Sequence, residues 1–248
     1  MLKVENLSVN INNKKIIDNI SFDLEENNML VILGKNGSGK TTIVKSILND
    51  IKYTGKIYLE EKEIKTLSIK EIAKKISVLM QNTDISNNLT VFDLISLGRY
   101  SHTNSMFCEI NEKDKEIINE YIKKTNLDDL KNRNISNLSG GELQRVYLCL
   151  AFVQDPNLLI LDEPINHLDI NNQIILFDIL DEWKTKEKKQ VISIVHDIVI
   201  AAKYSDKVLL IREGKLVDFG NKKEILSREN VIKTYDFDII DYFKNIDI

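Results

Sequence analysis

The sequence predicts an α/β fold with a mainly parallel sheet. Three apolar runs without polar alternation, Met29 to Leu33, Leu158 to Leu161 and Val191 to Val195, indicate strands that are buried on both faces. Amphipathic stretches with helix-opening residues separate them. The first 33 residues differ, because they alternate apolar and polar residues and are interrupted by pairs of asparagines. This predicts an N-terminal antiparallel β portion.

Composition sets limits on the class of protein. The chain has 248 residues, 43% of them hydrophobic, enough for one large α/β domain or two small ones. Its net charge of -4 gives no basic field for a nucleic-acid partner. The start of the chain lacks the apolar core of a signal peptide, which predicts a cytoplasmic location. Cys108 and Cys149 lack metal-site or C-x-x-C spacing and are expected to be free thiols.

Further elements follow in order along the chain. A helix is expected at Thr41 to Leu48, a strand at Gly55 to Leu59, and a helix after the capping box Ser68-x-x-Glu71. From about residue 82 to residue 149 the sequence pattern predicts mainly helices. The remaining expected elements are a strand at Ile76 to Met80, helices opened by Thr90-x-x-Asp93 and Asn111-x-x-Asp114, helices near Gln173 to Trp183 and at Ile198 to Tyr204, a strand at Lys207 to Ile211, a turn at Glu213-Gly214, and a last helix opened by Ser227-x-x-Asn230.

A glycine-rich segment, Gly34 to Thr42, joins the first buried strand to the following helix. It has the spacing G-x-x-x-x-G-K-T, which at a strand-to-helix turn is typical of a phosphate-binding loop. Glycines permit positive φ and let backbone N–H groups converge on phosphate oxygens at the positive end of the helix dipole. Lys40 is predicted to reach the β- and γ-phosphates and the Thr41 hydroxyl to bind Mg²⁺. The candidate nucleotide-binding residues here are Asn36, Gly37, Ser38, Gly39, Lys40, Thr41 and Thr42.

Two carboxylates follow the apolar run Leu158 to Leu161. Successive strand residues point to opposite sides, so Asp162 can face Mg²⁺ while Glu163 addresses a water that attacks the γ-phosphorus. An acidic pair at a strand end also serves to cap the next helix. The nearby phosphate-binding loop favours the catalytic interpretation.

A third motif reads Leu138-Ser139-Gly140-Gly141-Glu142. Ser139 and Glu142 form a capping box at the start of a helix, and the glycine pair leaves its backbone N–H groups uncovered for an anion. With this motif the whole chain resembles the ATP-binding cassette (ABC) ATPases, whose signature is L-S-G-G-[QE]. The resemblance implies a P-loop NTPase core in a single ATP-binding domain of residues 1–248, with a helical subdomain at about 82–149.

The resemblance also implies roles for residues that their chemistry alone would not single out. Gln81 matches the glutamine that contacts Mg²⁺ and the attacking water, Asp169 lies in the loop at the dimer seam, and His196 matches the histidine that contacts the γ-phosphate. In this family two cassettes pack head to tail around MgATP. The chain is therefore expected to be a homodimer in which Ser139, Gly140 and Gly141 act in trans.

The chain departs from the family pattern at a few positions. Ile11 stands where an aromatic residue usually stacks on adenine, so both ATP and GTP are candidate nucleotides. Ile165 replaces a small or hydroxyl residue. The segment Leu89 to His102 resembles T-V-x-x-L-x-x-x-G-R-x-P-H of ATPases for iron-siderophore, haem and cobalamin importers, with Ser101 in the place of proline.

That resemblance implies partners and a location. The chain is expected to energise an importer of iron complexes or cobalamin, bound to integral-membrane permease subunits on the inner face of the membrane and served by an extracytoplasmic binding protein. Alternatives are an ABC ATPase that acts on DNA or ribosomes, a transporter ATPase for another substrate, and a nucleotide-gated scaffold without useful turnover. The transported compound and the direction of transport stay open.

Overall fold

The computed structural model describes residues 1–80, 88–100, 102, 110–166, 168–239 and 241. Its contacts divide the chain into two compact units. The first unit comprises residues 1–68 and 190–248, and the second comprises residues 69–189. The predicted α/β class, with an N-terminal antiparallel sheet and parallel strands flanked by helices, is confirmed.

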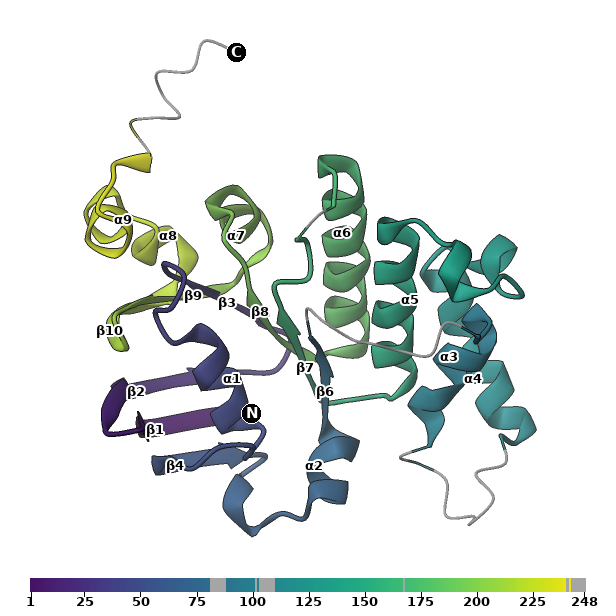
Figure 1. The fold of residues 1–248 in the computed structure, drawn as a ribbon, viewed down its shortest axis with the longest axis horizontal. Coiled ribbons are helices and arrows are strands. Elements are labelled where there is room, and N and C mark those ends of the chain that lie inside the picture. Colours follow the sequence, from purple (N-terminus) through teal and green to yellow (C-terminus); the bar gives the residue numbers. More distant parts are fainter. Residues whose placement is uncertain (81–87, 101, 103–109, 167, 240, 242–248) are drawn as a thin grey trace. The chain divides into compact units, whose positions relative to one another are not determined.

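An antiparallel sheet opens the first unit, with strand order β2-β1-β4-β5, and Figure 1 labels β2, β1 and β4 of this sheet. In β2, Ile20, Phe22 and Leu24 are buried while Ser21 is exposed, so the predicted alternation separates a core face from a solvent face. The strands of this sheet are β1 (Leu2–Ile11), β2 (Lys14–Leu24), β4 (Thr54–Leu59) and β5 (Lys62–Glu63).

The other strands of the first unit lie in the order β10-β9-β3-β8. Strand β3 (Met29–Leu33) is parallel to β8 (Gln190–Ile194) on one side and to β9 (Lys207–Arg212) on the other. Every residue of β3 is buried, which explains its uninterrupted apolar sequence. An unpredicted strand, β10 (Lys215–Asn221), returns antiparallel to β9 through the predicted turn at Glu213-Gly214.

The last helix of the first unit begins at its predicted opening residue, Ser227, and α1 (Lys40–Ile47) begins one residue before its predicted start. Gly39 N-caps α1. Ser227 N-caps α9 (Arg228–Tyr235), and the Ser227 hydroxyl accepts a hydrogen bond from the Asn230 N–H. The other helices of this unit are η1 (Ile64–Thr66), α7 (Ile198–Tyr204) and α8 (Lys222–Ile225).

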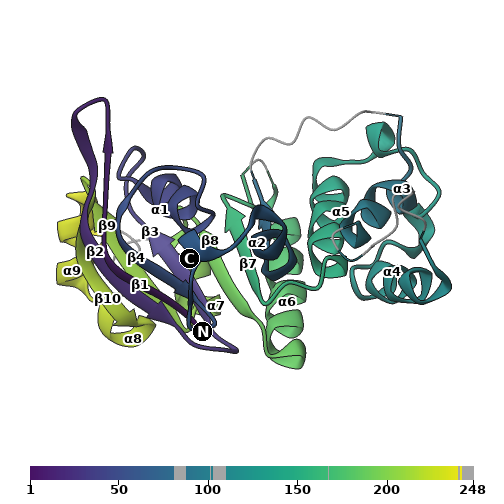
Figure 2. The ribbon, with the colours of Figure 1, turned by 90° about the horizontal axis from the view of Figure 1, so that it is seen from below.

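The second unit contains a parallel pair of strands, β6 (Ile76–Leu79) and β7 (Leu158–Asp162), and most of the helices. Among its helices α3, α4 and α5 pack on one another (Figure 2). The capping boxes predicted at Thr90 and Asn111 are both present. The helical elements are α2 (Ile69–Lys75), α3 (Val91–Ser96), η2 (Leu97–Arg99), α4 (Glu112–Lys124), η3 (Asp128–Leu130), η4 (Ile135–Asn137), α5 (Gly140–Val153) and α6 (Ile170–Glu187).

Cys149 lies in α5 and is a fully buried free thiol, as predicted. Burial raises its pKa to about 12, against a smaller opposite effect of the Thr125 hydroxyl. Cys108 lies outside the described residues. We expect the Cys108→Ser variant to react with a disulfide reagent at pH 8 only after denaturation, because the native thiol is both neutral and inaccessible. The absorbance of the thiol that the reagent releases measures the extent of reaction. Fast labelling of the native chain would contradict the prediction.

Candidate functional site

The Gly34–Thr42 loop joins β3 to α1, as predicted. Gly37 (φ 76°) and Gly39 (φ 106°) both have left-handed backbone, which residues with a Cβ rarely adopt. At Gly39 a Cβ would also lie 2.5 Å from the Ile17 Cδ1. The two glycines therefore allow the chain to turn sharply into α1, with the first N–H groups of the helix uncovered.

Lys40 lies inside this turn. Its side chain is buried, with the residue 5% exposed, and Nζ donates to the Gly34 carbonyl at 2.9 Å and the Lys35 carbonyl at 3.1 Å. The Ser38 hydroxyl is also buried, and no residue in the described ranges pairs with it. A buried ammonium and an unsatisfied hydroxyl in a glycine-rich loop fit a phosphate chain, which offers acceptors to both.

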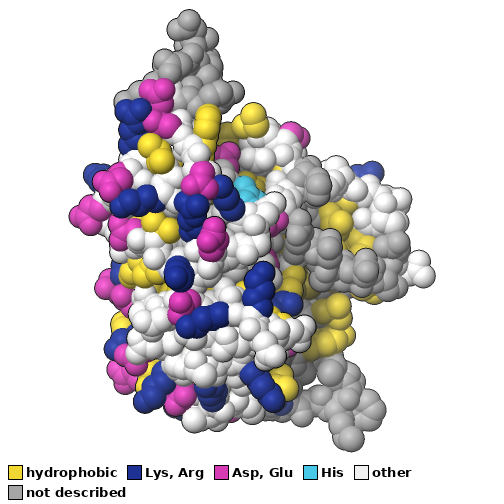
Figure 3. Space-filling view, turned by 60° about the vertical axis from the view of Figure 1, so that its left-hand side comes forward, with side chains coloured by type: hydrophobic (Ala, Val, Ile, Leu, Met, Phe, Trp, Pro, Cys, Tyr) yellow, Lys and Arg dark blue, Asp and Glu magenta, His cyan; other side chains and the backbone are white. Residues whose placement is uncertain are grey.

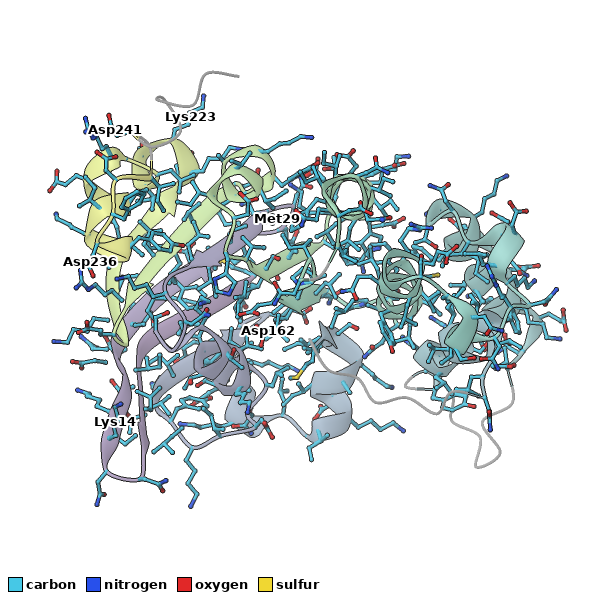
Figure 4. All side chains as sticks on the ribbon, turned by 45° about the horizontal axis from the view of Figure 1, so that its top comes forward. Lys14, Met29, Asp162, Lys223, Asp236 and Asp241 are labelled. Atoms are coloured by element: carbon cyan, nitrogen blue, oxygen red, sulfur yellow. The ribbon has the colours of Figure 1, made fainter. Side chains whose placement is uncertain are left out.

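Two distant segments support the loop from the same unit. The Gly214 N–H donates to the Ser38 carbonyl at 2.9 Å. Asp236, at the end of α9 (Figure 4), accepts from the Lys35 Nζ at 2.7 Å and from the Arg212 Nη1 at 2.6 Å. These two cations lower the pKa of the Asp236 carboxyl, the Lys35 hydrogen bond most of all. No sequence pattern signalled these supporting residues.

His196 follows β8 and is exposed. The next residue, Asp197, caps α7 by accepting from the Val199 and Ile200 N–H groups, which fixes the corner that carries the histidine. Because β3 and β8 are parallel neighbours, His196 and the loop after β3 lie at the same carboxyl edge of this sheet. The structure thus brings these two predicted site elements together.

In the second unit, Asp162 ends β7 and is only 7% exposed (Figure 4). Glu163 follows with φ 55°, a left-handed conformation that is unusual for a residue with a long side chain. The Asn166 Nδ2 donates to the Glu163 Oε2 at 2.6 Å. Asp162, in the strand, and Glu163, just after it, therefore differ in backbone conformation, and the side-chain amide of Asn166 donates a hydrogen bond to the Glu163 carboxylate.

The predicted capping box at the start of α5 is present. The Ser139 Oγ accepts from the Glu142 N–H at 3.3 Å, and the Glu142 Oε2 accepts from the Ser139 N–H at 2.7 Å. The bond from the Ser139 backbone, followed by that from its hydroxyl, lowers the pKa of Glu142. Ser139 and Gly140 are exposed, and a Cβ built at Gly140 would touch nothing within 4 Å. This helix start is open to an anion from outside.

Gly141 allows the start of α5 to approach the start of α6. A Cβ there would lie 2.6 Å from the Asn172 side chain. Asn172 donates through both its backbone N–H and its Nδ2 to Asp169, the N-cap of α6, and these bonds lower the pKa of Asp169. The Arg145 Nη1 donates to the Asn172 Oδ1 at 3.4 Å. Asn172 thus links the start of α5, at Gly141, to Asp169, and the sequence analysis missed this linking residue.

Other predicted positions have different outcomes. Gln81 lies outside the described residues, so the structure gives no contacts for it. Ile11 is 44% exposed at the end of β1, where its side chain is open to a ligand. Thr41 is exposed at the start of α1, while Ile165 is buried.

The comparisons with known proteins agree with this geometry. The family model described as ABC transporter matches residues 17–166, more than half of the chain. The chain belongs to the ABC transporter family. It is an ATP-binding cassette ATPase, and the resemblance drawn from the Ser139-Gly140-Gly141 motif is confirmed.

Relatives of this ABC ATPase match over nearly its full length. It is 30% identical to the petrobactin import ATP-binding protein YclP of Bacillus subtilis, covering 96% of this chain and 94% of the relative. It is 29% identical to the iron(3+)-hydroxamate import ATP-binding protein FhuC of the same organism, covering 96% and 88%. CbiO1 of Clostridium perfringens, part of an ABC transporter complex, has a similar structure, with a TM-score of 0.84, 26% identity, and 99% and 98% coverage.

Proposed function

We propose that this ABC ATPase is the ATP-hydrolysing subunit of an importer for iron complexes, either siderophores or haem, or for cobalamin. The observation that carries the proposal is the similarity, over 96% of the chain, to two ATPases named for the import of iron(3+)-hydroxamate and of petrobactin. The segment Leu89 to His102, with its importer-type pattern, supports the same class. The whole of residues 1–248 would form one ATP-binding domain, with a helical subdomain at about 82–149.

We assign the nucleotide roles as follows. The Gly34–Thr42 loop, with Asn36 to Thr42, would hold the phosphates of ATP. The Thr41 hydroxyl, the Asp162 carboxylate and Gln81 would hold Mg²⁺, since all three offer the oxygen ligands that this ion prefers. When bound, Mg²⁺ neutralises charge on the phosphates. Glu163 would orient and deprotonate the attacking water, with Gln81 and His196 assisting at the water and the γ-phosphate.

The signature would act across a homodimer. Ser139 caps the helix that begins at Gly140, a Cβ built at Gly140 would meet no atom within 4 Å, and Asn172 links Gly141 to Asp169. Since an exposed positive helix end suits an anion from another molecule, we assign these residues to the nucleotide of the partner subunit.

The membrane partner would be a permease. Within the described ranges, none of the helices has the length and apolarity that a bilayer-crossing helix requires. From the similarity to importer ATPases we propose peripheral attachment to the inner face of the membrane through integral-membrane permease subunits, which an extracytoplasmic binding protein supplies. Basic and acidic side chains are interspersed over the face in Figure 3, a distribution that favours no nucleic-acid partner.

The proposal is tested by copurification. A tagged Glu163→Gln chain is expressed in its native host, membranes are solubilised gently with MgATP, and bound proteins are identified by mass spectrometry. A polytopic permease is the expected partner. Ribosomal proteins or nucleic acid without a membrane subunit would keep the ATPase assignment and overturn the transport role. Stimulation of the purified complex by a ferric siderophore with its binding protein then tests the substrate class.

We expect Ile11 to make only a weak contact with the nucleotide base. Because an aliphatic side chain lacks aromatic stacking, we expect Ile11→Tyr to tighten ATP binding about fivefold, from about 1 kcal/mol of stacking. Titration with ATP and GTP measures the effect for each base. Asn10→Tyr, an exposed position next to it in β1, is the control. Equal affinities for the parent and Ile11→Tyr chains would remove Ile11 from the base site.

A further inference from the structure

The segment after α3 contacts the C-terminal end of α5. The Arg99 Nη1 donates to the Val153 carbonyl at 2.9 Å, and the His102 Nε2 lies 2.8 Å from the Gln154 carbonyl. A carbonyl oxygen only accepts, so His102 donates through Nε2. The last carbonyls of a helix have no partner within the helix. Two cationic or polar side chains therefore satisfy the end of the helix that begins with the signature motif.

Gly98 completes this contact. A Cβ at Gly98 would lie 2.6 Å from the Leu150 carbonyl, so only glycine lets η2 lie directly against the last turn of α5. Gly98, Arg99 and His102, hereafter the clasp, belong to the importer-type pattern, and no nucleotide role uses them. All three contact one helix end.

A buried ion pair anchors the clasp to α4. The Arg99 Nε donates to the Asp114 Oδ1 at 2.8 Å, and the two residues are 9% and 5% exposed. Asp114 also belongs to the capping box of α4, where it accepts from the Asn111 N–H. The planar guanidinium of Arg99 binds a carboxylate and a carbonyl at once, which fixes its geometry, and removal of the Asp114 carboxylate would leave a buried, uncompensated charge.

The same helix end is tied to the strand that leads toward Gln81. The Gln154 Oε1 accepts from the buried Ser77 hydroxyl of β6 at 2.9 Å, and its Nε2 donates to the Ala73 carbonyl of α2. The C-terminal end of α5 is thus fixed between the clasp and β6, all within the second unit.

We propose that the clasp positions the signature helix for trans contact with the nucleotide of the partner subunit. Helix α5 is about 20 Å long and stiff, so a tilt or rotation at its C-terminal end moves Ser139 and Gly140 at the other end. The cationic Arg99 at the C-terminal end also complements the dipole whose positive end carries the signature. Arg99 and His102 are positioning residues, and this role rests on the proposed trans site.

The experiment measures MgATP binding to one subunit separately from the ATP-driven dimerisation of two subunits. In the Glu163→Gln background, Arg99→Lys keeps the charge but not the fork that reaches both Asp114 and Val153. We expect MgATP affinity of the monomer within twofold of the parent, and ATP-driven dimerisation at least tenfold weaker by analytical ultracentrifugation. In the wild-type background we expect kcat at least tenfold lower with little change in KM.

Two further variants complete the design. His102→Ala, at a partly exposed position, is expected to show the same pattern more weakly and decides the matter if Arg99→Lys does not fold by circular dichroism. Lys115→Gln removes only the exposed pair with Glu112 beside Asp114 and should behave as the parent.

Each outcome has a defined meaning. Unchanged dimerisation in both Arg99→Lys and His102→Ala would overturn the proposed positioning role of the clasp, and so would an equal loss of dimerisation in Lys115→Gln. In either case, ATP-driven dimerisation of the parent chain would still support the trans site. A parent that stays monomeric with MgATP would overturn the trans site and the clasp together.

Discussion

Replacing Lys40 by alanine is expected to lower the affinity for MgATP by roughly 30- to 150-fold. The side chain is buried inside the loop, where its ammonium would give charge-assisted hydrogen bonds worth about 2 to 3 kcal/mol. Isothermal titration calorimetry at fixed salt concentration measures the change, and the hydrolysis rate should fall with it.

The matched control is Lys45→Ala. Lys45 lies on the same helix, in its last turn, and is exposed, so it tests the general loss of a positive charge near the loop. Equal affinity for Lys40→Ala and the parent would remove Lys40 from the phosphate site. Equal losses in both variants would assign the effect to net charge instead.

Replacing Glu163 by glutamine is expected to reduce kcat about 10³-fold, within the range of 10² to 10⁴ for loss of a general base. Glutamine has the same shape and keeps a side-chain oxygen for Asn166, so the local backbone should persist. Because ATP is retained, the dimer should accumulate. Phosphate release measures the rate, and size-exclusion chromatography with MgATP measures the dimer.

Glu182→Gln on the exposed side of α6 is the control for Glu163→Gln, since it removes one carboxylate from the second unit away from any predicted site. A Glu163→Gln chain with near-normal phosphate release would identify another residue as the base. Full loss of ATP binding in this variant would indicate damage to the fold rather than to the chemistry.

Much of the local structure was predictable from the sequence. The strand Met29–Leu33 has the predicted bounds, and the helix after the loop begins at Lys40, one residue earlier than expected. The capping boxes at Asn111 and Ser139 formed as their spacing predicts. Apolar runs, glycines and capping residues act through neighbours within about four positions, so the linear order of the chain is enough to identify them.

Contacts between distant positions were not predictable in this way. Asp236 reaches Lys35 across 201 residues, and Asn172 touches Gly141 only because α6 starts beside α5. The left-handed backbone of Glu163 also carries no signal in the sequence, since glutamate rarely adopts it.

The sequence by itself determined the candidate phosphate-binding loop, the acidic end of β7, the predicted signature at Ser139 and the ABC family, because each depends on residue type at short spacing. Only the tertiary structure decided what holds these motifs in place. Arg212 and Asp236 support the loop, Asn172 links the signature to Asp169, and Arg99 secures the far end of α5. These supporting contacts depend on which surfaces meet when strands pair and helices pack. No local pattern in the sequence reveals which surfaces will meet.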